Sequence, residues 1–147
     1  MSLDASVTSD LMSALHDCQE DLDRAAKVLG EDGQTEAAET MRTLSTHRSR
    51  QYMELRALAS VLGEDVSDSS SVLAGLRRQW VQAKATITGG ADAASVVAAV
   101  RKEEEHLADA YRQALEEDIS ADLRSVVERQ RADAERERAV LESVAGD

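Results

Sequence analysis

The stretch MRTLSTHRSRQYMELRALASVLG, residues 41–63, indicates the fold class more directly than any other part of the chain. Its apolar residues recur at alternating intervals of three and four positions, which places them on one face of an α-helix. The pattern ends before Gly63, so we predict a helix over about residues 35–62. Two polar residues, Arg48 and Gln51, share this face with the aliphatic ones. The face consists of Met41, Leu44, Arg48, Gln51, Leu55, Leu58 and Leu62.

Three further segments carry the same pattern, at about residues 9–29, 92–117 and 120–144. The complete absence of proline agrees with long, uninterrupted helices. The turn that begins at Gly30 ends the first segment, and Ser120 is a suitable N-cap for the last. Each of the three segments has its own inward face. In chain order, these faces are Leu11, Leu15, Cys18, Leu22, Ala25 and Leu29; Val97, Val100, Glu104, Leu107, Tyr111 and Ala114; and Leu123, Val127, Gln130, Ala134, Glu137, Leu141 and Val144. The sequence therefore predicts an all-α protein with four long helices.

The lengths of the connections suggest how the four helices are ordered in space. The first two and the last two are joined by only a few residues, so each pair forms an antiparallel hairpin. The central connection spans about thirty residues and contains a short amphipathic helix of its own, at about residues 71–88. Two hairpins joined by one long crossover are the ferritin-like arrangement of a four-helix bundle. An up-down-up-down bundle of five helices is the alternative.

Composition limits the classes of function. The chain has 147 residues, as expected for one domain over residues 1–147, with residues 1–8 as a flexible N-terminus. A formal net charge of −12 argues against nucleic-acid binding, which needs clustered Lys and Arg. No apolar run approaches the roughly 20 residues of a membrane span, and the first residues lack the pattern of a secretory leader. We therefore expect a cytoplasmic protein with neither a nucleic-acid nor a membrane partner.

Three blocks of the chain combine glycines, a basic pair and an acidic helix in a recognisable order. They are YMELRALASVLGED (52–65), GLRRQWVQAKATITGG (75–90) and EEEHLADAYRQALEED (103–118). The residues that matter most are Gly63, Ser69, Ser70, Ser71, Gly75, Arg77, Arg78, Trp80, Lys84, Thr88, Gly89, Gly90, Glu104, Glu105, Tyr111, Ala114 and Leu115. Together they resemble an uncharacterised bacterial family of ferritin-like four-helix-bundle domains of unknown function, although Arg77 and Arg138 stand where that family often has histidine. The resemblance implies a ferritin-like fold and no established activity.

The directions of the polar side chains decide whether the core can hold metal. Ferritin-like di-iron sites need inward carboxylates and Glu-x-x-His pairs. The literal Glu-x-x-His is Glu103 with His106, but these lie roughly 75° and 135° from the centre of their helix face, so we expect His106 to point to solvent. The first helix offers no inward carboxylate, and its central inward residue is Cys18. A degenerate metal site would consist of Glu104, Glu137 and His47.

The inward faces are polar only near the middle of the bundle. Counting from the hairpin turns places Arg48 and Glu104 at nearly the same height, with Gln130 and Glu137 on either side. We predict a buried network in which Arg48 pairs with Glu104 and Glu137, because one guanidinium can serve two carboxylates. The alternative is that Arg48 extends along its aliphatic stem and reaches water. The predicted network consists of Arg48, Gln51, Glu104, Gln130 and Glu137.

Two classes of function remain open from the sequence. The first is a non-catalytic bundle that acts through surface contacts or self-association, with no catalytic residue and no cofactor. The second is a metal-binding oxidoreductase or storage domain that uses iron or manganese at the degenerate site. Cys18 is interpreted as a small core residue, with a redox-sensitive thiol as the alternative.

Alanines beside the inward face of the helix predicted over residues 92–117 suggest an oligomer. Small side chains permit close approach of a second chain, so we expect a homodimer, with two-fold symmetry as the default. The alanines are Ala93, Ala94, Ala98, Ala99, Ala108 and Ala110.

Overall fold

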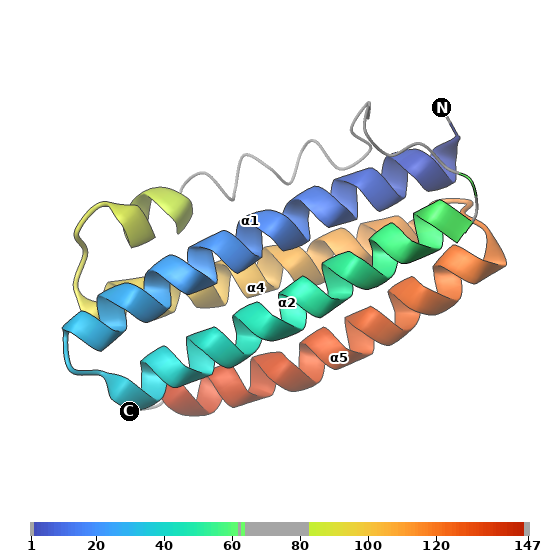
Figure 1. The fold of residues 1–147 in the computed structure, drawn as a ribbon. Helices are drawn as coiled ribbons and strands as arrows, with labels where there is room; N and C mark the ends of the chain where they lie inside the picture. The colour runs from blue at the N-terminus through green and yellow to red at the C-terminus, as the bar shows by residue number, and fades with distance from the viewer. Residues whose placement is uncertain (1, 62, 64–82, 146–147) are drawn as a thin grey trace.

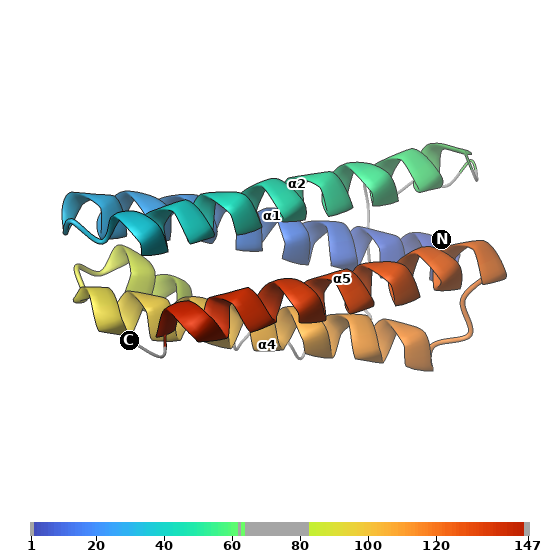
Figure 2. The same ribbon diagram turned by 90° about the horizontal axis from the view of Figure 1, so that it is seen from below.

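The computed structural model describes residues 2–61, 63 and 83–145, and it confirms the all-α class. Four long helices pack side by side as an elongated bundle, and residues 83–88 form a short additional helical segment (Figures 1 and 2). The long helices are α1 (Leu3–Glu31), α2 (Thr35–Val61), α4 (Ala93–Glu116) and α5 (Ala121–Ala145).

The directions of the helices define the topology of the bundle. α1 and α2 form an antiparallel hairpin, as do α4 and α5, whereas α2 and α4 run in the same direction (Figure 1). α1 also packs against α4, and α2 against α5, so the two hairpins face each other. Facing hairpins whose second and third long helices are parallel are the ferritin-like arrangement that the connection lengths predict. An up-down-up-down order would make those two helices antiparallel.

Most helix ends fall where the sequence signals them. The Asp92 side chain caps α4 by accepting a hydrogen bond from the Ser95 N–H at 2.9 Å. The Ser120 hydroxyl caps α5 by accepting one from the Leu123 N–H at 3.3 Å. Gly63, beyond the end of α2, has a φ of 70°, a left-handed conformation that glycine adopts without steric cost.

The first helix starts earlier than predicted. α1 begins at Leu3 instead of Ser9, so residues 3–8, expected to belong to a flexible N-terminus, are helical. The Ser2 hydroxyl caps α1 by accepting a hydrogen bond from the Ala5 N–H at 3.0 Å. Hydrophobic periodicity does not detect this start, because most of the buried residues here are small or polar. They are Ala5, Ser6, Val7 and Thr8.

The helix predicted over residues 71–88 is described only at its end. Residues 83–88 are helical, and Ala83 and Ile87 are buried against the bundle, on the face predicted for them. The remainder of that prediction, with Trp80, lies outside the described residues. Among the described residues, no helix is long and apolar enough to cross a membrane.

The apolar core consists of two clusters, one toward the α4–α5 turn and one toward the α1–α2 turn. Each cluster draws on all four long helices, and Cys18 is fully buried in the first. The largest fully buried members of the first cluster are Leu11, Leu15, Leu55, Leu107, Tyr111 and Leu123, and those of the second are Leu22, Leu29, Met41, Ile87 and Leu141. Polar side chains from α2, α4 and α5 occupy the level between the two clusters.

Candidate functional site

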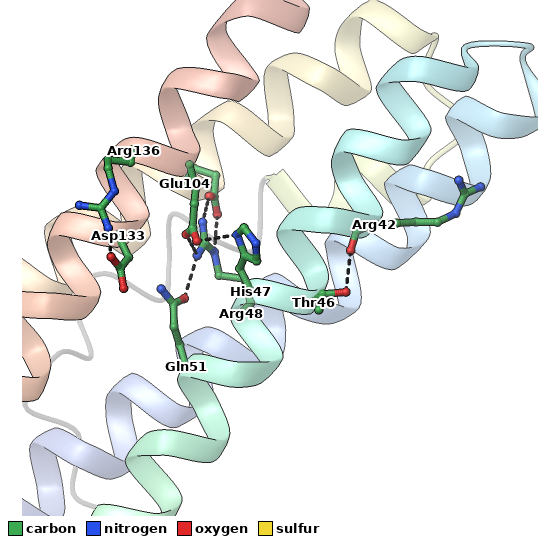
Figure 3. A network of polar contacts seen from close by, with 9 residues as sticks. Arg42, Thr46, His47, Arg48, Gln51, Glu104, Asp133 and Arg136 are labelled. Atoms are coloured by element: carbon green, nitrogen blue, oxygen red, sulfur yellow. Dashed lines mark hydrogen bonds and ion pairs between the residues drawn. The ribbon is translucent and has the colours of Figure 1, made fainter.

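The side chain of Arg48 projects from α2 into the level between the two clusters (Figure 3). It is 0% exposed, so the alternative in which Arg48 reaches water is wrong. Its Nε and Nη2 atoms donate to the two carboxylate oxygens of Glu104 on α4, with 3.3 Å from Nε to Oε2. Its Nη1 atom donates to Glu137 Oε1 on α5 at 2.6 Å. One guanidinium therefore links three helices, and we call these side chains and their contacts the Arg48 layer.

Two further side chains belong to the Arg48 layer. Arg48 Nη1 also donates to Gln51 Oε1, one turn along α2, at 2.7 Å. The second oxygen of Glu137 lies 2.5 Å from His47 Nδ1, an ion pair when the imidazole is protonated. The His47 side chain is 32% exposed, so it forms the part of the layer nearest to solvent.

A second set of hydrogen bonds joins the Arg48 layer to the first apolar cluster. The Tyr111 hydroxyl donates to Gln130 Oε1 at 2.8 Å. Gln130 Nε2 donates to the Gln51 carbonyl oxygen at 3.1 Å and to Glu54 Oε1 at 2.8 Å. Gln130 was predicted to be in the network, whereas Tyr111 and Glu54 were not. The available signal was the inward position of Tyr111, because a buried tyrosine hydroxyl usually finds a hydrogen-bond partner.

The electrostatics of the Arg48 layer favour a charged guanidinium. Burial lowers the pKa of Arg48, but the attraction and hydrogen bonds of Glu104 and Glu137 outweigh it, so the pKa lies above its usual range. Burial also raises the pKa of Tyr111, which therefore stays protonated and able to donate. One cation thus stands between two carboxylates, and the side chains of Arg48 and Glu104 are almost completely shielded from water.

The polar groups of the Arg48 layer interact mainly with one another. The guanidinium donates four hydrogen bonds, and both oxygens of Glu104 and of Glu137 have partners within the layer. Among the residues that the structure describes, no group of three or more His, Cys, Asp or Glu side chains is arranged to hold a metal ion. Glu104, Glu137 and His47, predicted as a degenerate metal site, are gathered around Arg48 instead. The arrangement can join helices and fix their register.

A groove of about 740 Å³ opens between the α1–α2 turn and the first turns of α4. Small and apolar side chains, among them Ala94 and Val97, form much of its wall. Arg101 also lines the groove, and its guanidinium is paired with Glu142 on α5. None of the residues of the Arg48 layer lines it, so the groove and the layer are separate features.

A second buried polar group, which we call the acid pair, consists of Asp21 on α1 and Glu103 on α4. Each residue is only 1% exposed, although neither belongs to the inward face predicted for its helix. Lys84 Nζ lies 3.9 Å from Asp21 Oδ1. The cause is the helical segment at residues 83–88, which covers this side of α1 and α4 and encloses positions that only flank the four-helix interior.

His106 is also buried, at 6% exposure, so the prediction that it points to solvent is wrong. It lies one turn beyond Glu103 on the same side of α4, a side that is covered in the folded chain. Burial and the positive charge of Lys102 lower the pKa of His106. The Glu-x-x-His motif therefore faces away from the Arg48 layer, to which α4 contributes the neighbouring Glu104.

Replacing Tyr111 with phenylalanine tests the outer part of the network. The substitution removes the hydroxyl that donates to Gln130 and leaves a buried amide oxygen without that donor. We expect the free energy of unfolding to fall by about 1–2 kcal/mol, the usual cost of stranding a buried polar group. Urea denaturation followed by circular dichroism measures this loss. The control is Tyr52→Phe, because Tyr52 is only partly buried, and equal losses in the two variants would contradict a specific role for Tyr111.

Comparison with known proteins places the chain in a family. The model of one family, described as a domain of unknown function (DUF2383), matches residues 8–117. This range covers more than half of the chain and contains Arg48 and Glu104 but not Glu137. No curated protein and no solved structure gives a significant match. The chain therefore belongs to the DUF2383 family, whose members are domains of unknown function.

Proposed function

We propose that this chain is a non-catalytic helical-bundle domain of the cytoplasm, which acts through self-association and surface contacts and needs no cofactor. The Arg48 layer is the observation that supports the proposal. In ferritin-like proteins that carry metal, inward carboxylates at this level of the bundle surround metal ions. Here Glu104 and Glu137 surround a guanidinium that the chain itself supplies. A fixed cation of this kind neutralises the carboxylates and joins three helices without a bound ion.

A structural role for the Arg48 layer follows from its place between two apolar clusters. If α2 slid by one heptad along its neighbours, Met41 or Leu55 would stand opposite Glu104 in place of Arg48. A buried carboxylate would then lack its cation, which is too costly to persist. The layer thus favours one alignment of the helices. Residues on the outer surface are then not needed for this alignment and can serve contacts with other molecules.

Elemental analysis separates this proposal from the metal-binding alternative. Protein purified without an added chelator is dialysed, and its iron and manganese are measured. We expect far less than one metal ion per chain, because Arg48 and His47 already engage the oxygens of Glu104 and Glu137. Iron or manganese that stays bound in stoichiometric amount would overturn the proposal and assign Glu104, Glu137 and His47 as candidate ligands.

The surface of α4 supports the self-association part of the proposal. Ala94 and Ala98 are exposed on this helix, and small side chains allow the axes of two helices to approach closely. Ala99 and Ala110, which were also expected to be available, are buried within the bundle and cannot contact a second chain. A two-fold contact would therefore be centred on the N-terminal half of α4.

Light scattering on the purified chain tests self-association. We expect a mass of about twice the 15.9 kDa of one chain at high micromolar concentration. Ala98→Arg should shift the mass toward that of the monomer, because a long charged side chain prevents close approach. Ala57→Arg, at an exposed position on α2, is the control and should remain dimeric. A parent chain that is monomeric at this concentration would rule out the dimer.

A further inference from the structure

The Arg48 layer does not account for the acid pair of Asp21 and Glu103. Both side chains are buried, and none of their four carboxyl oxygens receives a hydrogen bond from an N–H or O–H group of another described residue. The Lys84 ammonium forms an ion pair with Asp21 at 3.9 Å, but it lies too far away for a hydrogen bond, and its side chain is 40% exposed. Two acidic groups from different helices are thus buried with little compensation, and Asp21 lies close enough to Glu103 to raise its pKa.

Two ionised carboxylates cannot persist side by side in such a place. An unpaired buried charge is costly, and like charges in contact repel each other. Lys84 supplies one positive charge, so the group is neutral only when one of the two carboxyls carries a proton. A proton between the carboxyls also supplies the hydrogen bond that both lack. Burial, followed by the contact with Asp21, raises the pKa of Glu103 to about 11, which agrees with a neutral Glu103.

We propose that Asp21 and Glu103 share one proton, and that this acid pair, together with Lys84, forms a pH-dependent clasp that holds residues 83–88 against α1 and α4. The described charged groups that bear on the clasp are Asp21 on α1, Glu103 and Glu104 on α4, and Lys84 on the short segment, with Arg48 on α2 and Glu137 on α5 acting through Glu104. Arg48 balances the charge of Glu104, so the clasp depends mainly on its own proton and on Lys84.

The clasp makes stability depend on pH in a defined direction. The pKa of Glu103 is raised from an ordinary value of 4.5, so near neutral pH the folded chain holds a proton that the unfolded chain has lost. The stabilisation is therefore complete below the unfolded pKa and is lost as the pH rises toward the folded pKa. The equilibrium constant for unfolding should increase by up to about tenfold for each pH unit in this window.

Urea denaturation of the full chain between pH 6 and pH 9 tests this dependence. Glu103→Gln keeps the shape of the protonated carboxyl but cannot ionise. Between pH 6 and pH 9, we therefore expect the total increase in the unfolding constant of this variant to be at least tenfold smaller than that of the parent chain. Glu116→Gln, an exposed glutamate on the same helix, is the control and should follow the parent chain. A Glu103→Gln profile as steep as that of the parent overturns the proposal.

A measurement on the unsubstituted chain makes the test independent of how the variants fold. The side-chain carboxyl carbon of Glu103 or Asp21, observed by nuclear magnetic resonance, should show one protonated acid at pH 7. Two ionised carboxylates at pH 7 overturn the shared proton. Displacement of that proton by MgCl2 alone at micromolar concentration also overturns the proposal, because the pair would then be a metal site.

Lys84→Met tests the clasp itself, because methionine keeps an apolar stem and removes the ammonium group. Hydrogen exchange at the amides of residues 85–88 should become several-fold faster in this variant, while exchange within α2 should not change. Unchanged exchange at residues 85–88 overturns the role of Lys84.

Discussion

Arg48→Met is expected to lower the free energy of unfolding by about 3–5 kcal/mol, a large share of the stability of a domain of this size. Methionine fills part of the volume of the arginine side chain, but it leaves Glu104 buried without a cation. Glu137 is less affected, because it is partly exposed and keeps its contact with His47. Urea denaturation at pH 7, followed by circular dichroism, measures the loss.

Arg112 provides a matched control for this substitution. It also pairs with two carboxylates, Asp109 at 3.6 Å and Glu116 at 3.1 Å, but its side chain is 48% exposed. Arg112→Met should therefore cost less than about 1 kcal/mol, as is usual for ion pairs in contact with water. Similar losses in the two variants would show that burial gives Arg48 no special importance.

The second large effect is a recovery of stability. Arg48→Met combined with Glu104→Leu removes both members of the buried pair and places apolar side chains between the two apolar clusters. We expect each single variant to be strongly destabilised, because each strands one buried charge, and the double variant to regain at least about 2 kcal/mol relative to the sum of the single losses. The parent chain and the three variants form a double-mutant cycle. Additive losses in that cycle would contradict the pairing of Arg48 with Glu104.

The position of Arg48 could be predicted because it depends on one helix only. Arg48 lies on the same helical face as Leu44 and Leu55, and a helix that buries these leucines also buries the residue between them. The height of Glu104 followed from counting residues, since every α-helix rises by about 1.5 Å per residue. The parallel directions of α2 and α4 followed from the lengths of the connections alone.

The acid pair could not be predicted in this way. Asp21 and Glu103 lie beside the inward faces of their helices, and such positions are exposed in a bundle of four helices. Their burial depends on the segment at residues 83–88, whose position against α1 and α4 is not specified by any heptad pattern. Polar residues occupy the covered side of α4. The apolar face of this helix is therefore narrower than the face that is buried in the folded chain, and the sequence pattern reveals only the apolar face.

The bridge that Arg48 makes between helices affects how the family can diverge. It joins residues that are 56 and 89 positions apart in the chain. A substitution at one position alone strands a buried charge, whereas joint replacement by apolar residues does not. We therefore expect substitutions at these positions to occur mostly together during evolution. In a relative with leucine or methionine at the position of Arg48, we expect the acidic residue at the position of Glu104 to be missing as well, which would leave a record of coevolution between α2 and α4.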